Sequence, residues 1–190
     1  MPVVTISRQL GSEGNAVAAA VAAKLKAPLL GRDLINEAAR RAGVPECALA
    51  ALDDLGLLGV RPSKEARRAY RQSLGRVVRE VAESGHAVIV GRNAQVILRG
   101  WPNVLHVHIT APEPVRLQRV MARYRCSEEV ARARIRAADA VRARIFRSIH
   151  EFKGDDAACC DLVLNMAKFG VDEAAELIVL ATQFIGKSSS

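Results

Sequence analysis

The stretch ISRQLGSEGNAVAAAVAAKL, residues 6–25, has the order of a buried strand, a glycine-bearing turn and an alanine-rich helix. In such a turn the backbone N–H groups point inward and the next helix begins with its positive end, which together attract anions. Gly11 and Gly14 supply the backbone freedom, and Ser12 adds a hydroxyl donor. The stretch therefore predicts an α/β fold with a phosphate-binding loop after its first strand.

The strict motif of a nucleotide-binding phosphate loop, G-x4-G-K-[ST], fails at three positions of this turn. Gln9 replaces the first glycine, Asn15 replaces the lysine, and Ala16 replaces the hydroxyl residue that holds Mg²⁺. The pattern alone leaves two interpretations open. The turn is either a phosphate-binding loop with substitute parts or an ordinary strand-to-helix turn that contains two glycines.

Short apolar runs alternate with helical patterns along the rest of the chain. We expect five strands, at residues 3–7, 28–30, 87–91, 104–110 and 161–165. We expect helices at 14–25, 32–43, 63–84, 112–124, 127–150 and 172–184, a short helix before Pro102, and irregular or broken helix at 44–62. This alternation predicts a parallel sheet, whose ligands bind beyond the carboxyl ends of the strands.

Charge indicates an anionic partner. The chain has a formal net charge of +8, and 22 of its 28 basic residues are arginine, whose planar fork binds phosphate. Residues 113–150 hold ten arginines against four acids, so much of the excess lies there. Aromatic residues make up only 4% of the chain, which disfavours nucleic acid as the partner because bases stack on aromatic side chains.

Composition also argues against a membrane segment and a resident metal centre. The longest apolar run, residues 16–23, is too short to span a bilayer, and the start of the chain resembles a strand rather than a secretory signal, so we expect a cytoplasmic protein. The four cysteines have neither zinc-ligand nor disulfide spacing. His106 and His108 share a strand face, but no third ligand lies nearby.

Six collinear stretches resemble the cytidylate kinase-like family, a branch of the P-loop nucleoside monophosphate kinases. They are ISRQLGSEG, LLGRDLINEAA, GHAVIVGRNAQVIL, PNVLHVHITAP, DAVRARIF and CDLVLN, and the resemblance covers about residues 2–180. It implies a five-stranded parallel sheet flanked by helices, ATP with Mg²⁺ at the first loop, a nucleoside monophosphate opposite, and an arginine-rich helical lid at about 125–150. It also implies a single domain at 1–184, with a flexible tail at 185–190.

The resemblance assigns expected roles to individual residues. The ATP phosphates would be bound by Gly11, Ser12, Gly14 and Asn15, with positive charge from Arg8, Arg119 and Arg123. The acceptor nucleotide would be bound by Arg32, Asp33, Arg92, Asn93, Asp139 and Arg142. The residues expected to take part in transfer are Arg92, Arg136, Asp139 and Arg142.

Four departures from the family pattern weaken these assignments. Family members commonly carry glycine at Glu13, arginine at Asn15, and aspartate at the positions of Gly31 and Asn93. The Glu13 carboxylate would repel ATP phosphates by about 1 kcal/mol or more unless a cation lies between them. Three interpretations therefore remain: a nucleoside monophosphate kinase, a degenerate nucleotide-binding or regulatory protein, and a nucleic-acid-binding module. The acceptor nucleotide and a homo-oligomeric state stay open.

The spacing of charges in the expected lid gives a separate prediction. Arg132, Arg136, Asp139 and Arg142 recur every three or four residues, so they lie near one helix face. Three arginines with one aspartate repel one another unless an anion binds among them. We therefore expect this segment to be mobile when empty and ordered when a ligand is bound.

Overall fold

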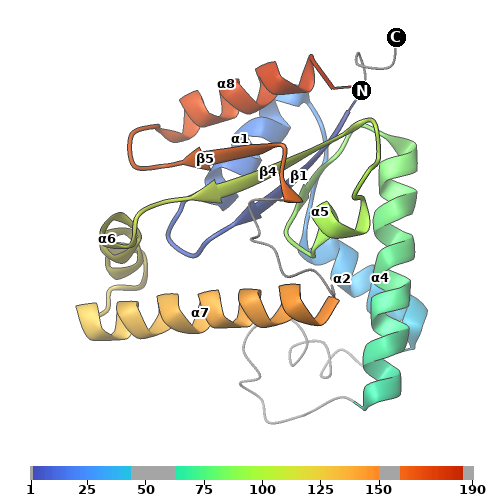
Figure 1. Cartoon of the computed structure of the whole chain (residues 1–190), viewed down its shortest axis with the longest axis horizontal. Coiled ribbons are helices and arrows are strands. Elements are labelled where there is room, and N and C mark those ends of the chain that lie inside the picture. The colour runs from blue at the N-terminus through green and yellow to red at the C-terminus, as the bar shows by residue number, and fades with distance from the viewer. Residues whose placement is uncertain (1, 44–62, 150–158, 186–190) are drawn as a thin grey trace.

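The structure, a computed structural model, describes residues 2–43, 63–149 and 159–185 (Figure 1). Five strands form one sheet in the order β2-β3-β1-β4-β5. Their bounds are β1 (Val3–Arg8), β2 (Leu29–Leu30), β3 (Val88–Val90), β4 (Val104–Thr110) and β5 (Leu162–Asn165). Every pairing between them is parallel. The five predicted strands are confirmed, and their ends differ from the predicted ones by at most one residue.

Helices cover both faces of this sheet (Figure 1). One face packs against α1 (Gly14–Leu25) and α8 (Val171–Thr182), and the other packs against α2 (Arg32–Ala42), α4 (Lys64–Ser84) and α5 (Ala94–Ile97). Successive residues of β1 alternate between the two cores: Val4 enters the first and Val3 the second. Because helices cover both faces of the sheet, the central strand β1 is buried from Val3 to Ser7, including the hydroxyl residues Thr5 and Ser7.

Two further helices pack on each other beside the sheet. They are α6 (Glu113–Tyr124) and α7 (Glu128–Ile149), the latter within the arginine-rich segment. Their shared core contains Leu117 and Val120 from α6 and Ala131 and Ile135 from α7. Leu10, from the turn after β1, also packs there, so this helix pair is attached to the glycine-bearing turn.

Capping residues account for several helix ends. The Ala66 N–H donates to Ser63 Oγ at 3.1 Å, and the Val130 N–H donates to Ser127 Oγ at 3.4 Å, so a serine caps the start of α4 and another caps the start of α7. Gly43 ends α2 with a left-handed backbone, φ 63°, as glycine permits. The expectations for residues 44–62 and for most of the tail lie outside the described residues.

The two strand histidines have partners within the sheet. The Thr5 hydroxyl lies 2.8 Å from His106 Nδ1, and the Ser7 hydroxyl lies 2.6 Å from His108 Nδ1. In each case β1 pairs the hydroxyl residue directly with the histidine of β4. In the part of the chain that the structure describes, no group of three or more His, Cys, Asp or Glu residues could hold a metal ion. Over the same residues, no helix has the length and apolar character needed to cross a bilayer.

Candidate phosphate-binding site

The turn between β1 and α1 depends on both of its glycines. Gly11 has φ +83°, and a Cβ there would lie 2.7 Å from the backbone oxygen of Arg116. A Cβ at Gly14 would lie 2.4 Å from Arg8 Cβ and 3.2 Å from Ile109 Cβ. Real side chains do not fit at such distances, so the turn keeps its course against α6 and β1 only with glycine at both positions.

The start of α1 offers unpaired backbone donors to this turn. The first intrahelical bonds are those that the Ala16 and Val17 N–H groups donate to the Glu13 carbonyl. The N–H groups of Gly14 and Asn15 precede them and are therefore among the donors that a helix N-terminus leaves unsatisfied. Ser12 is buried, and its hydroxyl donates to the Gln9 carbonyl at 2.8 Å, so it braces the turn.

Glu13 has a cation beside it. It precedes α1 with a left-handed backbone, φ 63°, and its carboxylate lies 2.8 Å from Arg119 Nη2. The same nitrogen of Arg119 donates to the Met166 carbonyl at 3.0 Å, beyond the end of β5. Arg119 Nη1 is buried and has no hydrogen-bond partner among the described residues. Arg119 therefore compensates the negative charge of Glu13, and its buried Nη1 still has a hydrogen-bond donor without a partner in the described part of the chain.

Arg8 connects the turn to the loop after β3. Its Nε donates to Asn15 Oδ1 at 2.9 Å. A Cβ at Gly91 would lie 2.6 Å from Arg8 Nη1, so the guanidinium rests on the glycine that precedes Arg92. Because β1 and β3 are parallel neighbours, with Ile6 opposite Val90, their following loops meet at one edge of the sheet. Arg8 thus bridges the two loops in which the sequence predicted phosphate-binding residues.

The loop after β3 has an unusual backbone. Gly91, Arg92 and Asn93 all have positive φ, at 70°, 60° and 52°. The left-handed region costs roughly 1–2 kcal/mol per residue for side chains such as that of arginine. Asn93 then precedes α5, where the Val96 and Ile97 N–H groups donate to its carbonyl. Backbone strain of this kind concentrates at ligand-binding loops, so it supports Arg92 and Asn93 as candidates for ligand binding.

The sequence interpretation missed Arg116. This α6 arginine is only 4% exposed, and its Nε donates to the Leu10 carbonyl at 2.8 Å. Its Nη2 lies 2.8 and 2.9 Å from the two carboxylate oxygens of Asp139 on α7. One buried side chain therefore ties the turn to both helices of the arginine-rich segment. The sequence did contain a signal for its burial, because Arg116 lies one helical turn before Val120, on the apolar side of α6.

The charges of α7 are distributed differently from the expectation. Arg132 lies 2.6 Å from Glu113 and 2.7 Å from Glu128, so acids from the first turns of α6 and α7 neutralise it. Asp139 forms an ion pair with Arg116. The expected cluster of mutually repelling arginines is therefore partly neutralised because the α6–α7 packing brings acids beside it. Arg136 is exposed and Arg142 is partly buried.

The remaining predicted residues lie on α6 and α2. Arg123 is exposed, with its guanidinium 5.7 Å from the centre of the Tyr124 ring. Asp33 is exposed in the first turn of α2. Arg32 begins that helix, and its side chain lies outside the described ones. No described contact brings Asp33 or Arg123 to the turn after β1.

The residues fit ATP phosphates better than they fit a resident metal ion. The unsatisfied amides of α1, the space kept by Gly11 and Gly14, and the buried Nη1 of Arg119 all suit an anion. A hydroxyl ligand is missing at Ala16, and the Ser12 hydroxyl donates within the turn. The turn therefore offers Mg²⁺ no free hydroxyl ligand of its own.

This fold and this turn define a P-loop kinase-type protein. A shikimate kinase from Acinetobacter baumannii has the same fold at a TM-score of 0.55, with 14% identity over 97% of this chain and 94% of that chain. An uncharacterized protein from Eubacterium ventriosum gives a TM-score of 0.74, with 24% identity over 96% of this chain and 99% of that chain. At these identities the likeness concerns the fold alone.

Residues 3–168 match the cytidylate kinase-like family, and the chain belongs to it. A cytidylate kinase from Pyrobaculum calidifontis is 26% identical over 93% of this chain and 90% of that protein. A uronate isomerase from Corynebacterium glutamicum is 22% identical over 78% of this chain, and the chain spans only 28% of that relative's length. Family and fold support a nucleotide kinase-type function, with ATP as the implied phosphoryl donor.

Proposed function

We propose that this protein transfers the γ-phosphoryl group of Mg-ATP to the phosphate of a nucleoside monophosphate. The observation that carries the proposal is the bridge made by Arg8, which contacts Asn15 beside the phosphate-binding turn and rests on Gly91 beside Arg92. A donor loop and an acceptor loop held against one guanidinium is the arrangement that transfer between two phosphates requires.

In this proposal the amides of residues 11–15 bind the ATP phosphates, with Arg8 and Arg119 supplying positive charge and Arg123 adding to the field. The buried Nη1 of Arg119 supports this role because it would gain its missing hydrogen bond from a phosphate oxygen. Arg92 and Asn93 bind the acceptor phosphate, and Arg32 and Asp33 extend that side.

The α7 residues Arg136, Asp139 and Arg142 complete the proposed site from the lid side. An acceptor oxygen attacks the γ-phosphorus, the bond to the β–γ bridging oxygen breaks, and ADP leaves without a covalent intermediate. The protein's contribution is alignment and charge neutralisation, together with exclusion of water when α7 closes. Asp139 acts in this scheme through Arg116, because that is the contact it makes.

A second candidate is a nucleotide-binding protein without turnover. Glu13 favours it, because a carboxylate stands at the start of α1 where ATP phosphates would lie. Asn15 and Ala16 favour it as well, since they supply neither the loop lysine nor the hydroxyl. Both candidates make the chain a single nucleotide-binding unit over residues 1–184.

Release of ADP from Mg-ATP, measured across a panel of nucleoside monophosphates, tests the two candidates. Turnover with one acceptor supports the kinase and identifies that acceptor. A rise in melting temperature with Mg-ATP but no ADP above the acceptor-free control supports the non-catalytic protein. Absence of both effects would sink the proposal of a nucleotide site.

A further inference from the structure

Residues of α4 and Ile97 of α5 line an open hollow that the proposed function does not use. Its volume is about 600 Å³, and it is lined by Arg71, Gln72, Gly75, Arg76, Arg79 and Ile97. Four of these six residues have exposed side chains on α4, whereas Gly75 forms a buried floor between them. Figure 1 shows α4 along the right side of the molecule, α5 beside it and α6 at the left. None of the six residues that line the hollow has a role in the proposed function.

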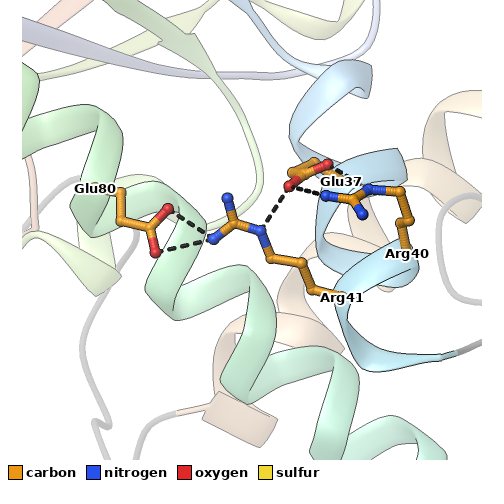
Figure 2. Close-up of polar contacts among 4 residues, drawn as sticks. All are labelled: Glu37, Arg40, Arg41 and Glu80. Carbon is orange, nitrogen blue, oxygen red and sulfur yellow. Dashed lines mark hydrogen bonds and ion pairs between the residues drawn. The ribbon is translucent and has the colours of Figure 1, made fainter.

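The three arginines of the hollow lack acidic partners. Within the described residues, Arg71, Arg76 and Arg79 form no ion pair with a carboxylate. The adjoining surface behaves differently (Figure 2). There Arg41 of α2 binds Glu37 at 2.6 Å and reaches Glu80 of α4 at 2.6 Å. The chain therefore neutralises arginines along the α2–α4 contact but leaves those of the hollow uncompensated.

Gly75 at the floor is unfavourable for α4 itself. Glycine in a helix interior lowers helix stability relative to alanine, and like charges one turn apart lower it further. Arg76 and Arg79 lie one turn apart, and a Cβ at Gly75 would lie 3.3 Å from Arg79 Nη1. The missing side chain leaves room for the Arg79 guanidinium above the helix backbone. The arrangement lowers the stability of α4, and a bound anion would offset the repulsion between the arginines.

We propose that the hollow formed by Arg71, Arg76, Arg79 and Gly75 is a second anion site, which binds a compact ligand carrying two or more linked phosphates. Guanidinium groups bind phosphate oxygens in pairs, and several of them suit a chain of phosphates better than a single charge. A volume of about 600 Å³ suits a small molecule. Among the described residues, the lining offers Gln72 for hydrogen bonds and the aliphatic Ile97, but no aromatic surface on which nucleic-acid bases would stack.

The test titrates the protein with inorganic tripolyphosphate and monitors the NMR signals of the arginine Nε–H groups. Because each arginine has its own signal, binding at the hollow can be distinguished from binding at the turn after β1. The signals of Arg71, Arg76 and Arg79 should shift in a saturable way. In Gly75→Glu, the new carboxylate lies one turn from both Arg71 and Arg79 and should pair with them. We expect that variant to need at least tenfold more tripolyphosphate for the same shift, while its melting temperature equals or exceeds that of the wild type.

Two controls isolate the hollow from general effects. Gly75→Ala adds helix stability without charge and should change the affinity by less than threefold. Arg68→Gln removes one exposed charge from α4 outside the hollow and should also change it by less than threefold.

If the three signals do not shift, or if Gly75→Glu titrates like Gly75→Ala, there is no site. If a ten-nucleotide thymidine strand saturates the shifts at a lower phosphate concentration than tripolyphosphate, the hollow binds a nucleic-acid strand and the compact-ligand proposal is wrong.

Discussion

Arg116 and Asp139 form an ion pair through one guanidinium nitrogen and both carboxylate oxygens, at 2.8 and 2.9 Å, with Arg116 almost wholly buried. The pair is the only described bond from Asp139, and Arg116 also holds the Leu10 carbonyl of the phosphate-binding turn. A movement of α7 that displaces Asp139 would therefore also displace Arg116 and its contact with the turn. This link couples the α6–α7 helix pair to the turn after β1.

Replacing Asp139 with asparagine should lower the free energy of unfolding by about 1–3 kcal/mol, because it leaves the buried Arg116 without its carboxylate. Urea unfolding measures the change. Arg132→Gln is the matched control: its ion pairs are largely exposed, so it should cost less than about 1 kcal/mol. Equal costs for the two variants would show that the Arg116–Asp139 pair adds nothing beyond a surface contact.

Replacing Arg92 with alanine should weaken acceptor binding by about 2–5 kcal/mol, the cost of losing a desolvated charge-assisted pair. Binding of ATP should change much less. Alanine has the same left-handed penalty as arginine at φ 60°, so the variant tests the guanidinium and not the backbone. Calorimetric titration with each ligand measures both affinities, and Arg99→Ala serves as an exposed control. Equal losses for ATP and acceptor would mean that Arg92 is structural.

The double replacement Glu13→Gly with Asn15→Arg should raise the affinity for ATP. It removes a carboxylate from the turn, frees Arg119 Nη2 from the 2.8 Å pair and adds a cation to the first turn of α1. Glycine also suits the φ of 63° at this position. Titration with Mg-ATP measures the gain, and Asn15→Arg alone shows how much of it comes from the added charge. An unchanged affinity would show that the turn is not aligned with the ATP phosphates.

Acid should destabilise the protein through His106. Burial lowers the pKa of His106 below its usual 6.5, although the charge of Asp161 opposes the shift. The unfolded chain then binds a proton more readily than the native state, so the contribution is complete above pH 6.5 and is lost as the pH falls below it. For one proton the slope is at most about 1.4 kcal/mol per pH unit.

His106→Gln tests this prediction because glutamine still offers a polar partner to the Thr5 hydroxyl but does not titrate. Urea unfolding at pH 7.5 and pH 5.5 should show a smaller loss of stability on acidification in this variant than in the wild type. The same loss in both proteins would mean that acidic groups elsewhere govern the pH dependence.

Glu37 should stay ionised in strongly acidic solution. Hydrogen bonds from Arg40 and then Arg41 lower its pKa from 4.5 to about 2, so its contribution is present above pH 4.5 and is lost as the pH falls toward 2 (Figure 2). NMR titration of the carboxyl carbon measures this pKa. Arg40→Ala should move it back toward 4.5, since Arg40 is the larger cause. A pKa near 4.5 in the wild type would contradict the geometry of the cluster.

Much of the fold could be predicted from the sequence because its signals are local. Apolar β-branched runs define β1 and β4, and serines and glycines set helix ends, as Ser63 does for α4. The turn after β1 could be predicted for the same reason: its two glycines lie within one short stretch. The structure shows why glycine is needed at both positions: the Arg116 backbone lies close to Gly11, and the Arg8 side chain lies close to Gly14.

The partners of charged residues could not be predicted, because they come from distant parts of the chain. Arg132 lies on the expected arginine face of α7, but Glu113 of α6 neutralises it after the two helices pack. Glu13 seemed to oppose phosphate binding until Arg119 was placed 2.8 Å from it. Spacing within one helix cannot reveal such pairs, since the contacts of α6 with α7 and with the turn before α1 decide them.

The place of β1 in the sheet bears on how the chain is made. It is made before the other four strands of this sheet, yet it is the central strand and pairs only with β3 and β4. The buried contact between Thr5 and His106 joins residues 101 positions apart. Nascent chains that end before β4 therefore carry an apolar strand with one or both neighbours missing. Such long-range parallel pairing slows folding, so the unpaired first strand is the segment that a chaperone would have to shield during synthesis.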